Sequence, residues 1–175
     1  PEELPERYKD KVVDETASLF DNALAFARVE IKHSWSKWNQ PVDYKEWGMP
    51  AHMVNAYYSP DSNTIVFPAA ILQAPFYSLE QSSSQNYGGI GTVIAHEISH
   101  AFDNNGAQFD KEGNLNKWWL DEDYEAFEEK QKEMIALFDG VETEAGPANG
   151  KLIVSENIAD QGGITAALTA AKDEK

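Results

Sequence analysis

The sequence contains no cysteine. Disulfide bonds and thiolate metal ligands are therefore excluded, and any metal site must use histidine nitrogens or carboxylate oxygens. The lack of cysteine does not identify the cellular compartment.

Basic residues are also scarce. Lysine and arginine together number 14 against 30 acidic residues, which gives a formal net charge of −16. Nucleic acids and anionic membrane surfaces both select for basic patches, so we expect neither as a partner. No run approaches the roughly 18 apolar residues of a membrane span, and we expect no membrane contact from this segment.

The chain has 175 residues, of which 42% are hydrophobic and 25% charged. These values are typical of an ordinary globular protein, and we expect residues 1–175 to form a single domain with its own core. The sequence begins at Pro1 rather than at a methionine, so we also expect it to be a piece of a longer protein.

Apolar periodicity and turn residues predict a mostly helical α+β fold with one small hairpin. Hairpin strands are expected at 53–58 and 64–67, joined by the turn residues 59–63. An irregular connection is expected after them, formed by Pro68, Pro75 and the polar run 81–86. Helices are expected at 14–38, 90–104, 121–138 and 153–171. We further expect Gly106 to stop the second helix, Asp121 to cap the third, residues 141–151 to form a loop, and Trp118 and Trp119 to lie in the core.

The motif with the clearest chemistry is His96-Glu97-Ile98-Ser99-His100. Positions i and i+4 share one face of a helix, so both histidines can reach one ion. Two histidines at this spacing with an intervening glutamate form the zinc-peptidase signature. Glu97 leaves the helix about 100° from His96, where it flanks the metal and can take a proton from the zinc-bound water.

A third ligand must come from elsewhere, because catalytic zinc takes three protein ligands and a water. Glu156 is the best candidate, with Asp160 at i+4 on the same face of an expected helix. One carboxylate of this pair can bind zinc while the other orients a ligand histidine. Asp103 faces the same side as His96 and His100, and is either a partner of a ligand histidine or a charge at a helix end.

The predicted strand that contains Asn55 and Ala56 has a possible role in substrate binding. A peptide can add to an exposed strand edge through backbone hydrogen bonds, and Asn55 offers both an amide donor and a carbonyl acceptor. An ordinary structural strand has the same pattern.

Several motifs, in this order, resemble the neprilysin-like zinc endopeptidases. They are Asn55-Ala56-Tyr57-Tyr58-Ser59, Ile65-Val66-Phe67-Pro68-Ala69, Ile71-Leu72-Gln73, Asn86-Tyr87-Gly88-Gly89-Ile90-Gly91, the run from His96 to Asp103, and Glu156-Asn157-Ile158-Ala159-Asp160.

The resemblance implies a thermolysin-like zincin catalytic core with a hairpin beside the metal helix. It implies one zinc ion on His96, His100 and Glu156, and Glu97 as general base. Asp160 would hydrogen-bond a ligand histidine, His96 in preference to His100. Asn55 and Ala56 would hold the backbone of a peptide substrate. In its lack of cysteine the sequence resembles the bacterial members of the family, since the animal ectoenzymes carry disulfides.

Members of this family also have a large helical N-terminal region, and a histidine and an arginine beyond the Glu-x-x-x-Asp motif. This sequence has no histidine or arginine after Asp160. We therefore expect a catalytic core that is truncated at both ends relative to the family. The expected activity is hydrolysis of oligopeptides by a metal-activated water. The alternatives are a catalytically silent zinc-binding module and a thermolysin-type peptidase of another branch.

Overall fold

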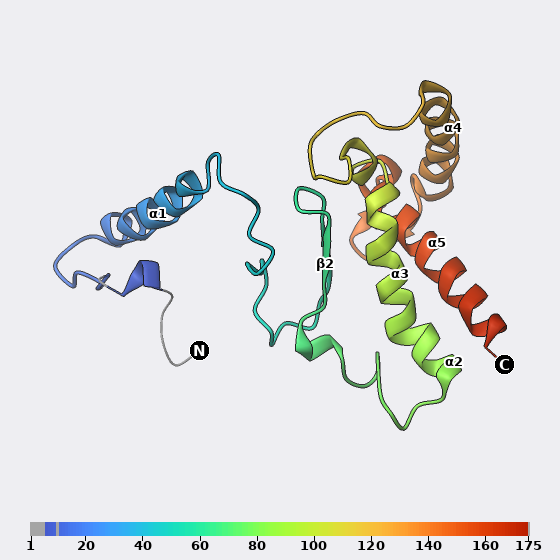
Figure 1. The fold of residues 1–175 in the computed structure, drawn as a ribbon, viewed down its shortest axis with the longest axis horizontal. Coiled ribbons are helices and arrows are strands. Elements are labelled where there is room, and N and C mark those ends of the chain that lie inside the picture. Colours follow the sequence, from blue (N-terminus) through green and yellow to red (C-terminus); the bar gives the residue numbers. More distant parts are fainter. Residues whose placement is uncertain (1–5, 10, 175) are drawn as a thin grey trace. The chain divides into compact units, whose positions relative to one another are not determined.

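The computed structural model describes residues 6–9 and 11–174. The chain divides into two compact units, one that ends at Asp43 and one that begins at Tyr44. Each unit is described by itself, and Figure 1 shows the elements of both.

The first unit consists of η1 (Glu6–Tyr8) and α1 (Leu19–Ser36). Arg7 Nε lies 2.7 Å from Glu30 Oε1, and the Tyr8 ring packs against Phe26, so that η1 is held on α1. The helix was expected to begin at residue 14. It begins at Leu19 instead, because the Ser18 side chain accepts a hydrogen bond from the Asp21 N–H and caps the first turn.

The second unit contains the predicted hairpin near its N-terminal end. β1 (Tyr57–Ser59) and β2 (Thr64–Val66) are antiparallel, with Tyr58 opposite Ile65. The strands are shorter than expected because residues 53–56 do not join the ladder. There the Asn55 side chain accepts the Ala56 N–H at 2.9 Å, a local bond that replaces strand pairing.

The helix that carries the histidines is longer than expected at its N-terminus. Consecutive helical segments run through α2 (Ser83–Asn86), the π-turn η3 (Tyr87–Gly91), α3 (Thr92–Ser99) and the 3₁₀ turn η4 (His100–Phe102). The expected irregular connection at 81–86 is therefore wrong from Ser83 onward, because Ser82 and Gln85 form a capping box that starts the helix.

Gly106 does not stop this helix. The helix ends where Asp103 turns extended, and Gly106 begins the short 3₁₀ turn η5 (Gly106–Gln108). Glycine is required there for another reason, since a Cβ at Gly106 would lie 1.8 Å from the carbonyl oxygen of His100.

Two more helices complete the second unit, α4 (Asp121–Phe138) and α5 (Gly150–Asp173). Leu120 rather than Asp121 is the N-cap of α4, without a side-chain bond. The expected loop at 141–151 contains a small hairpin, β3 (Glu142–Thr143) with β4 (Gly146–Pro147), and α5 begins three residues early because the Asn149 side chain accepts the Leu152 N–H.

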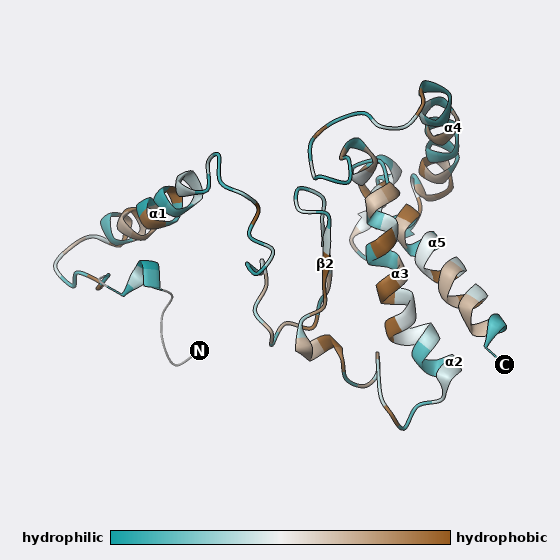
Figure 2. Ribbon diagram, in the orientation of Figure 1, coloured by the Kyte–Doolittle hydropathy of each residue, from teal (hydrophilic) through white to brown (hydrophobic). Residues whose placement is uncertain are grey.

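The α3–α5 interface sets the geometry of the site. The two helices lie side by side in Figure 1, and Figure 2 shows apolar residues along both. Ala159 is fully buried. A Cβ at Gly163 would lie 2.8 Å from the Thr92 carbonyl oxygen and 3.0 Å from the backbone nitrogen of His96. The small residues of α5 therefore allow its backbone to approach the turn that carries His96.

A separate apolar cluster connects the segment before β1 with the start of the long helix. It contains Ala56, Ile71 and Ile90. Partly buried Phe67, Phe76, Tyr77 and Val93 pack on it, and η2 (Ala69–Ile71) contributes Ile71. The two tryptophans that were expected in the core have different surroundings. Trp119 packs on Tyr124 and Phe127 of α4. Trp118 is 47% exposed and lines a cavity of about 390 Å³ with Phe102 and Phe109. The expectation that Trp118 lies in the core is therefore wrong.

The predicted fold class is confirmed: the chain is mostly helical, with a two-stranded hairpin beside the His-Glu-x-x-His helix. Among residues 6–9 and 11–174, every helix is too short or too polar to serve as a membrane span.

We expect Gly163→Ala to lower the free energy of unfolding by about 1–3 kcal/mol, because the new methyl group meets backbone atoms that cannot rotate away. Gly88→Ala is the matched control, since a Cβ at Gly88 has no atom within 4 Å. It should leave stability unchanged or raise it by up to about 1 kcal/mol. Urea unfolding of the two variants measures both effects, and equal midpoints would contradict the close approach.

Candidate metal centre

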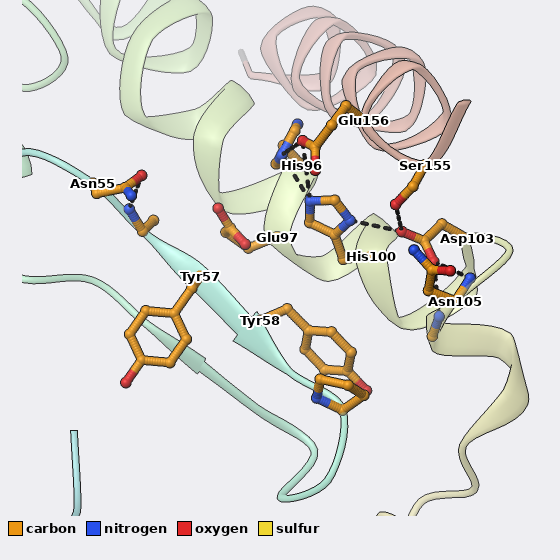
Figure 3. A pocket seen from close by; sticks show the side chains of 13 residues that line it. Asn55, Tyr57, Tyr58, His96, Glu97, His100, Asp103, Asn105, Ser155 and Glu156 are labelled. Atoms are coloured by element: carbon orange, nitrogen blue, oxygen red, sulfur yellow. Dashed lines mark hydrogen bonds and ion pairs between the residues drawn. The ribbon is translucent and has the colours of Figure 1, made fainter. Parts of the chain in front are cut away.

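Three side chains converge between α3, η4 and α5 (Figure 3). His96 Nε2 and His100 Nε2 lie 2.9 Å apart, and Glu156 Oε2 lies 3.5 Å from the first and 3.6 Å from the second. One donor atom from each residue falls within 4.8 Å of the other two, so the group could hold a metal ion.

These distances fit zinc. Two ligand atoms at 2.0–2.1 Å from a tetrahedral ion lie roughly 3.3 Å apart, close to the three separations found here. Two imidazoles and one carboxylate also form a ligand set that catalytic zinc sites use.

The second ring nitrogens support the same conclusion. His96 Nδ1 lies 2.8 Å from Asp160 Oδ1, and His100 Nδ1 lies 2.8 Å from Asp103 Oδ2. An ionised carboxylate can only accept a hydrogen bond, so in the neutral imidazole each Nδ1 is the N–H donor and each Nε2 presents its lone pair. Two lone pairs that face each other across 2.9 Å repel unless a proton or a metal ion lies between them.

Asp103 is the most constrained acidic group of the site, with 1% of its surface exposed. Its Oδ1 accepts the N–H groups of Asn105 and Gly106, each at 2.7 Å, and its Oδ2 also accepts the Ser155 hydroxyl at 2.5 Å. Burial acts to raise the pKa of Asp103, and the hydrogen bonds from His100, Ser155 and the two amides outweigh it, so that the pKa lies below its usual value. The hydrogen bond to Asp103 in turn raises the pKa of His100.

Glu97 lies beside His96, His100 and Glu156, but its side chain leaves α3 on a different face from the two histidines. Its side chain faces the strand that contains Tyr58, and only 5% of its surface is exposed. Burial raises the pKa of Glu97, while the charges of His100 and His96 and a hydrogen bond from the Tyr58 backbone N–H act to lower it. A carboxylate in this position can exchange a proton with a molecule in the cleft.

A cavity of about 460 Å³ brings the site residues together with the strand. Asn55, Ala56, Tyr57 and Tyr58 line one side, and His96, Glu97, His100 and Glu156 line the other. The Tyr58 backbone N–H is turned toward Glu97, so β1 lies against the Glu97 carboxylate.

Ser155, Asn105 and Tyr58 also line this cavity, and the sequence interpretation had assigned none of them a role. Ser155 directly precedes Glu156 of the Glu-x-x-x-Asp motif, and this position could have indicated that Ser155 lies at the site. The bond between Ser155 and Asp103 joins residues 52 positions apart, and no local pattern predicts such a pair.

We expect Asp103→Asn and Asp160→Asn each to weaken zinc binding by about 10–100-fold, because each removes the carboxylate that orients one histidine. Only Asp103→Asn should also lower the stability of the metal-free protein, by about 1–3 kcal/mol, since the Asp103 carboxylate is buried and accepts four hydrogen bonds. The Asp160 side chain is 65% exposed. Isothermal titration with zinc and urea unfolding separate the two effects, and equal stabilities would contradict this difference.

The fold and the site together define a His-Glu-x-x-His metallopeptidase centre, with histidines from one helix and a carboxylate from a second. The model of peptidase family M13 matches residues 55–175, and the chain belongs to this family. The resemblance to neprilysin-like enzymes is therefore confirmed.

Relatives of this chain carry the names of peptidases. The chain is 81% identical to the neutral endopeptidase of Lactococcus lactis subsp. cremoris, over all of this chain and 28% of that protein. It is 41% identical to endothelin-converting enzyme 1 of Rattus norvegicus, over 92% of this chain and 22% of that protein. The chain thus spans less than a third of the length of these relatives.

Solved structures share the fold. The crystal structure of PepO from Lactobacillus rhamnosis HN001 superposes with a TM-score of 0.83 at 44% identity, over 99% of this chain and 28% of that one. The zinc metalloprotease Zmp1 of Mycobacterium tuberculosis, in complex with an inhibitor, gives a TM-score of 0.78 at 41% identity, over 88% of this chain and 24% of that one.

Proposed function

We propose that this chain is the zinc-binding core of an endopeptidase, with one zinc ion held by His96, His100 and Glu156. The observation that carries the proposal is the convergence of three donor atoms beside the buried carboxylate of Glu97. The names of the lactococcal and mycobacterial relatives, neutral endopeptidase and zinc metalloprotease, support the same activity.

When bound by His96, His100 and Glu156, a zinc ion would lower the pKa of a water molecule toward about 7 and polarise a peptide carbonyl. Glu97 takes a proton from the attacking water and passes it to the leaving amine. Asp160 and Asp103 keep the two imidazoles in the tautomer that presents Nε2.

The substrate backbone binds along the free edge of β1. Ala56, which directly precedes β1, contributes its backbone carbonyl, because its N–H is engaged by the Asn55 side chain. The Asn55 amide oxygen is engaged by the Ala56 N–H, so Asn55 binds substrate through its NH₂ group. The proposed substrates are oligopeptides, and the proposed catalytic core is residues 1–175 as a single domain.

A catalytically silent zinc module is the rival function. The position of Glu97 argues against it, because a structural ion needs no base and an almost fully buried carboxylate is costly to maintain.

The test uses the full-length gene product that contains this chain. We expect about one zinc per chain by metal analysis, and hydrolysis of an internally quenched peptide that is lost after chelation and returns in proportion to added zinc. A protein that retains zinc but cleaves no peptide supports the silent module, and one that cleaves equally without zinc contradicts the proposal.

A further inference from the structure

The hydrogen bond between Ser155 and Asp103 connects two parts of the chain that carry ligands of the proposed zinc ion. Ser155 lies on α5 directly before Glu156, and Asp103 directly follows η4, which begins with His100. The Ser155 hydroxyl donates to Asp103 Oδ2 at 2.5 Å, and the same oxygen lies 2.8 Å from His100 Nδ1. One carboxylate oxygen thus links the helix that carries Glu156 to the imidazole of His100 (Figure 3).

The two oxygens of Asp103 are held in different ways. Oδ1 accepts the backbone N–H groups of Asn105 and Gly106, which belong to the turn that Asp103 itself begins. Within residues 6–9 and 11–174, Oδ2 accepts from two groups, the His100 ring and the Ser155 hydroxyl. Asp103 is almost fully buried, so bulk solvent does not supply a substitute donor. Loss of the hydroxyl would therefore leave Oδ2 held only by the ring that it orients.

Glu156 depends on the same connection. Its side chain is 65% exposed, and its Oε2 lies near the two Nε2 atoms with which it would share an ion. The place of this carboxylate is thus set by where α5 lies relative to the histidines. Asp160 ties α5 to His96 at 2.8 Å, and the Ser155 bond ties it to the carboxylate partner of His100. Within two turns, α5 supplies one ligand and bonds that orient the other two.

We propose that Ser155 is a positioning residue of the metal centre, whose hydroxyl holds the Asp103 carboxylate in the orientation that aligns His100 with the other two ligands. The proposal rests on the proposed zinc-binding function and names a residue that determines how tightly this site holds its ion. Ser155 acts through Asp103, so its contribution should disappear when the Asp103 carboxylate is removed.

The experiment measures the zinc dissociation constant of the full-length gene product by competition with a chromogenic chelator, and the urea midpoint of the same proteins without metal. We expect Ser155→Ala to weaken zinc binding about 10-fold, at the lower end of the range for loss of a group that orients a ligand. Alanine is the strongest helix former, so α5 should remain intact. Ser155→Thr keeps a hydroxyl and should bring the affinity back close to that of the unmodified protein.

Ser99→Ala is the matched control for loss of a hydroxyl beside a ligand histidine. Ser99 directly precedes His100, but its hydroxyl donates to the Ala95 carbonyl oxygen at 2.8 Å within the same helix. Zinc affinity should therefore be unchanged in this variant.

A double substitution tests whether Ser155 acts through Asp103. In Asp103→Asn, the N–H groups of Asn105 and Gly106 engage the one amide oxygen, and the NH₂ group at the place of Oδ2 cannot accept from His100. Ser155→Ala should then change zinc affinity by less than about 2-fold, because the effects of residues in one network are not additive.

Unchanged zinc affinity in Ser155→Ala overturns the positioning role while the zinc site stands. A further loss of about 10-fold in the Asp103→Asn background also overturns it, because Ser155 would then act by another route. An unmodified protein that binds no zinc overturns the proposed zinc site, and the role of Ser155 with it.

Discussion

Replacement of Glu97 by glutamine is expected to abolish hydrolysis while zinc remains bound. The amide has nearly the shape of the carboxylate, so the Tyr58 strand and the two histidines keep their places, but it cannot accept a proton at neutral pH. A positioned general base contributes about 10²–10⁴-fold to rate, and we expect a fall in kcat of at least that size.

The measurement is kcat of the full-length gene product at equal zinc occupancy, with Glu125→Gln as the control for the substitution itself, because Glu125 is an exposed residue of α4. Near-normal turnover in Glu97→Gln would remove Glu97 from the mechanism. Loss of zinc together with activity would show instead that Glu97 supports the metal centre.

Removal of a ligand should have a different signature. His96→Ala and Glu156→Ala each delete one of the three donor atoms, and we expect both variants to lose bound zinc on dialysis and to be inactive. Because the ligands come from α3, η4 and α5, zinc should also tie these elements together. At a free zinc concentration of 100 times Kd, it raises the free energy of unfolding by about 2.7 kcal/mol.

The two ligand variants should therefore show no zinc-dependent rise in urea midpoint. His52→Ala and Glu125→Ala, which remove exposed groups of the same kinds, should retain the whole rise. Full zinc retention in both ligand variants would contradict the ligand set.

Local patterns in the sequence predicted most of the helices, because their determinants lie within a few residues. The i, i+4 spacing of His96 and His100 places both on one face of any helix that contains them, and the hairpin follows from turn residues between two apolar runs. Boundaries were less accurate where capping side chains act: Ser18, Ser82 and Asn149 each start a helix at a residue that apolar periodicity alone does not identify.

The sequence by itself determined the family, the fold class and the candidate residues for metal binding and proton transfer, because each depends on residue types at short, fixed spacings. Only the tertiary structure decided how those residues meet. Glu156 approaches the histidines because Ala159 and Gly163 let α5 lie against α3, and Asp103 orients His100 within a bond network that includes Ser155, 52 residues away. A cavity lined by Phe102, Phe109 and Trp118 likewise arises where the end of the histidine helix meets the segment before α4. Contacts between distant segments depend on packing and burial of the whole unit, which no local pattern encodes.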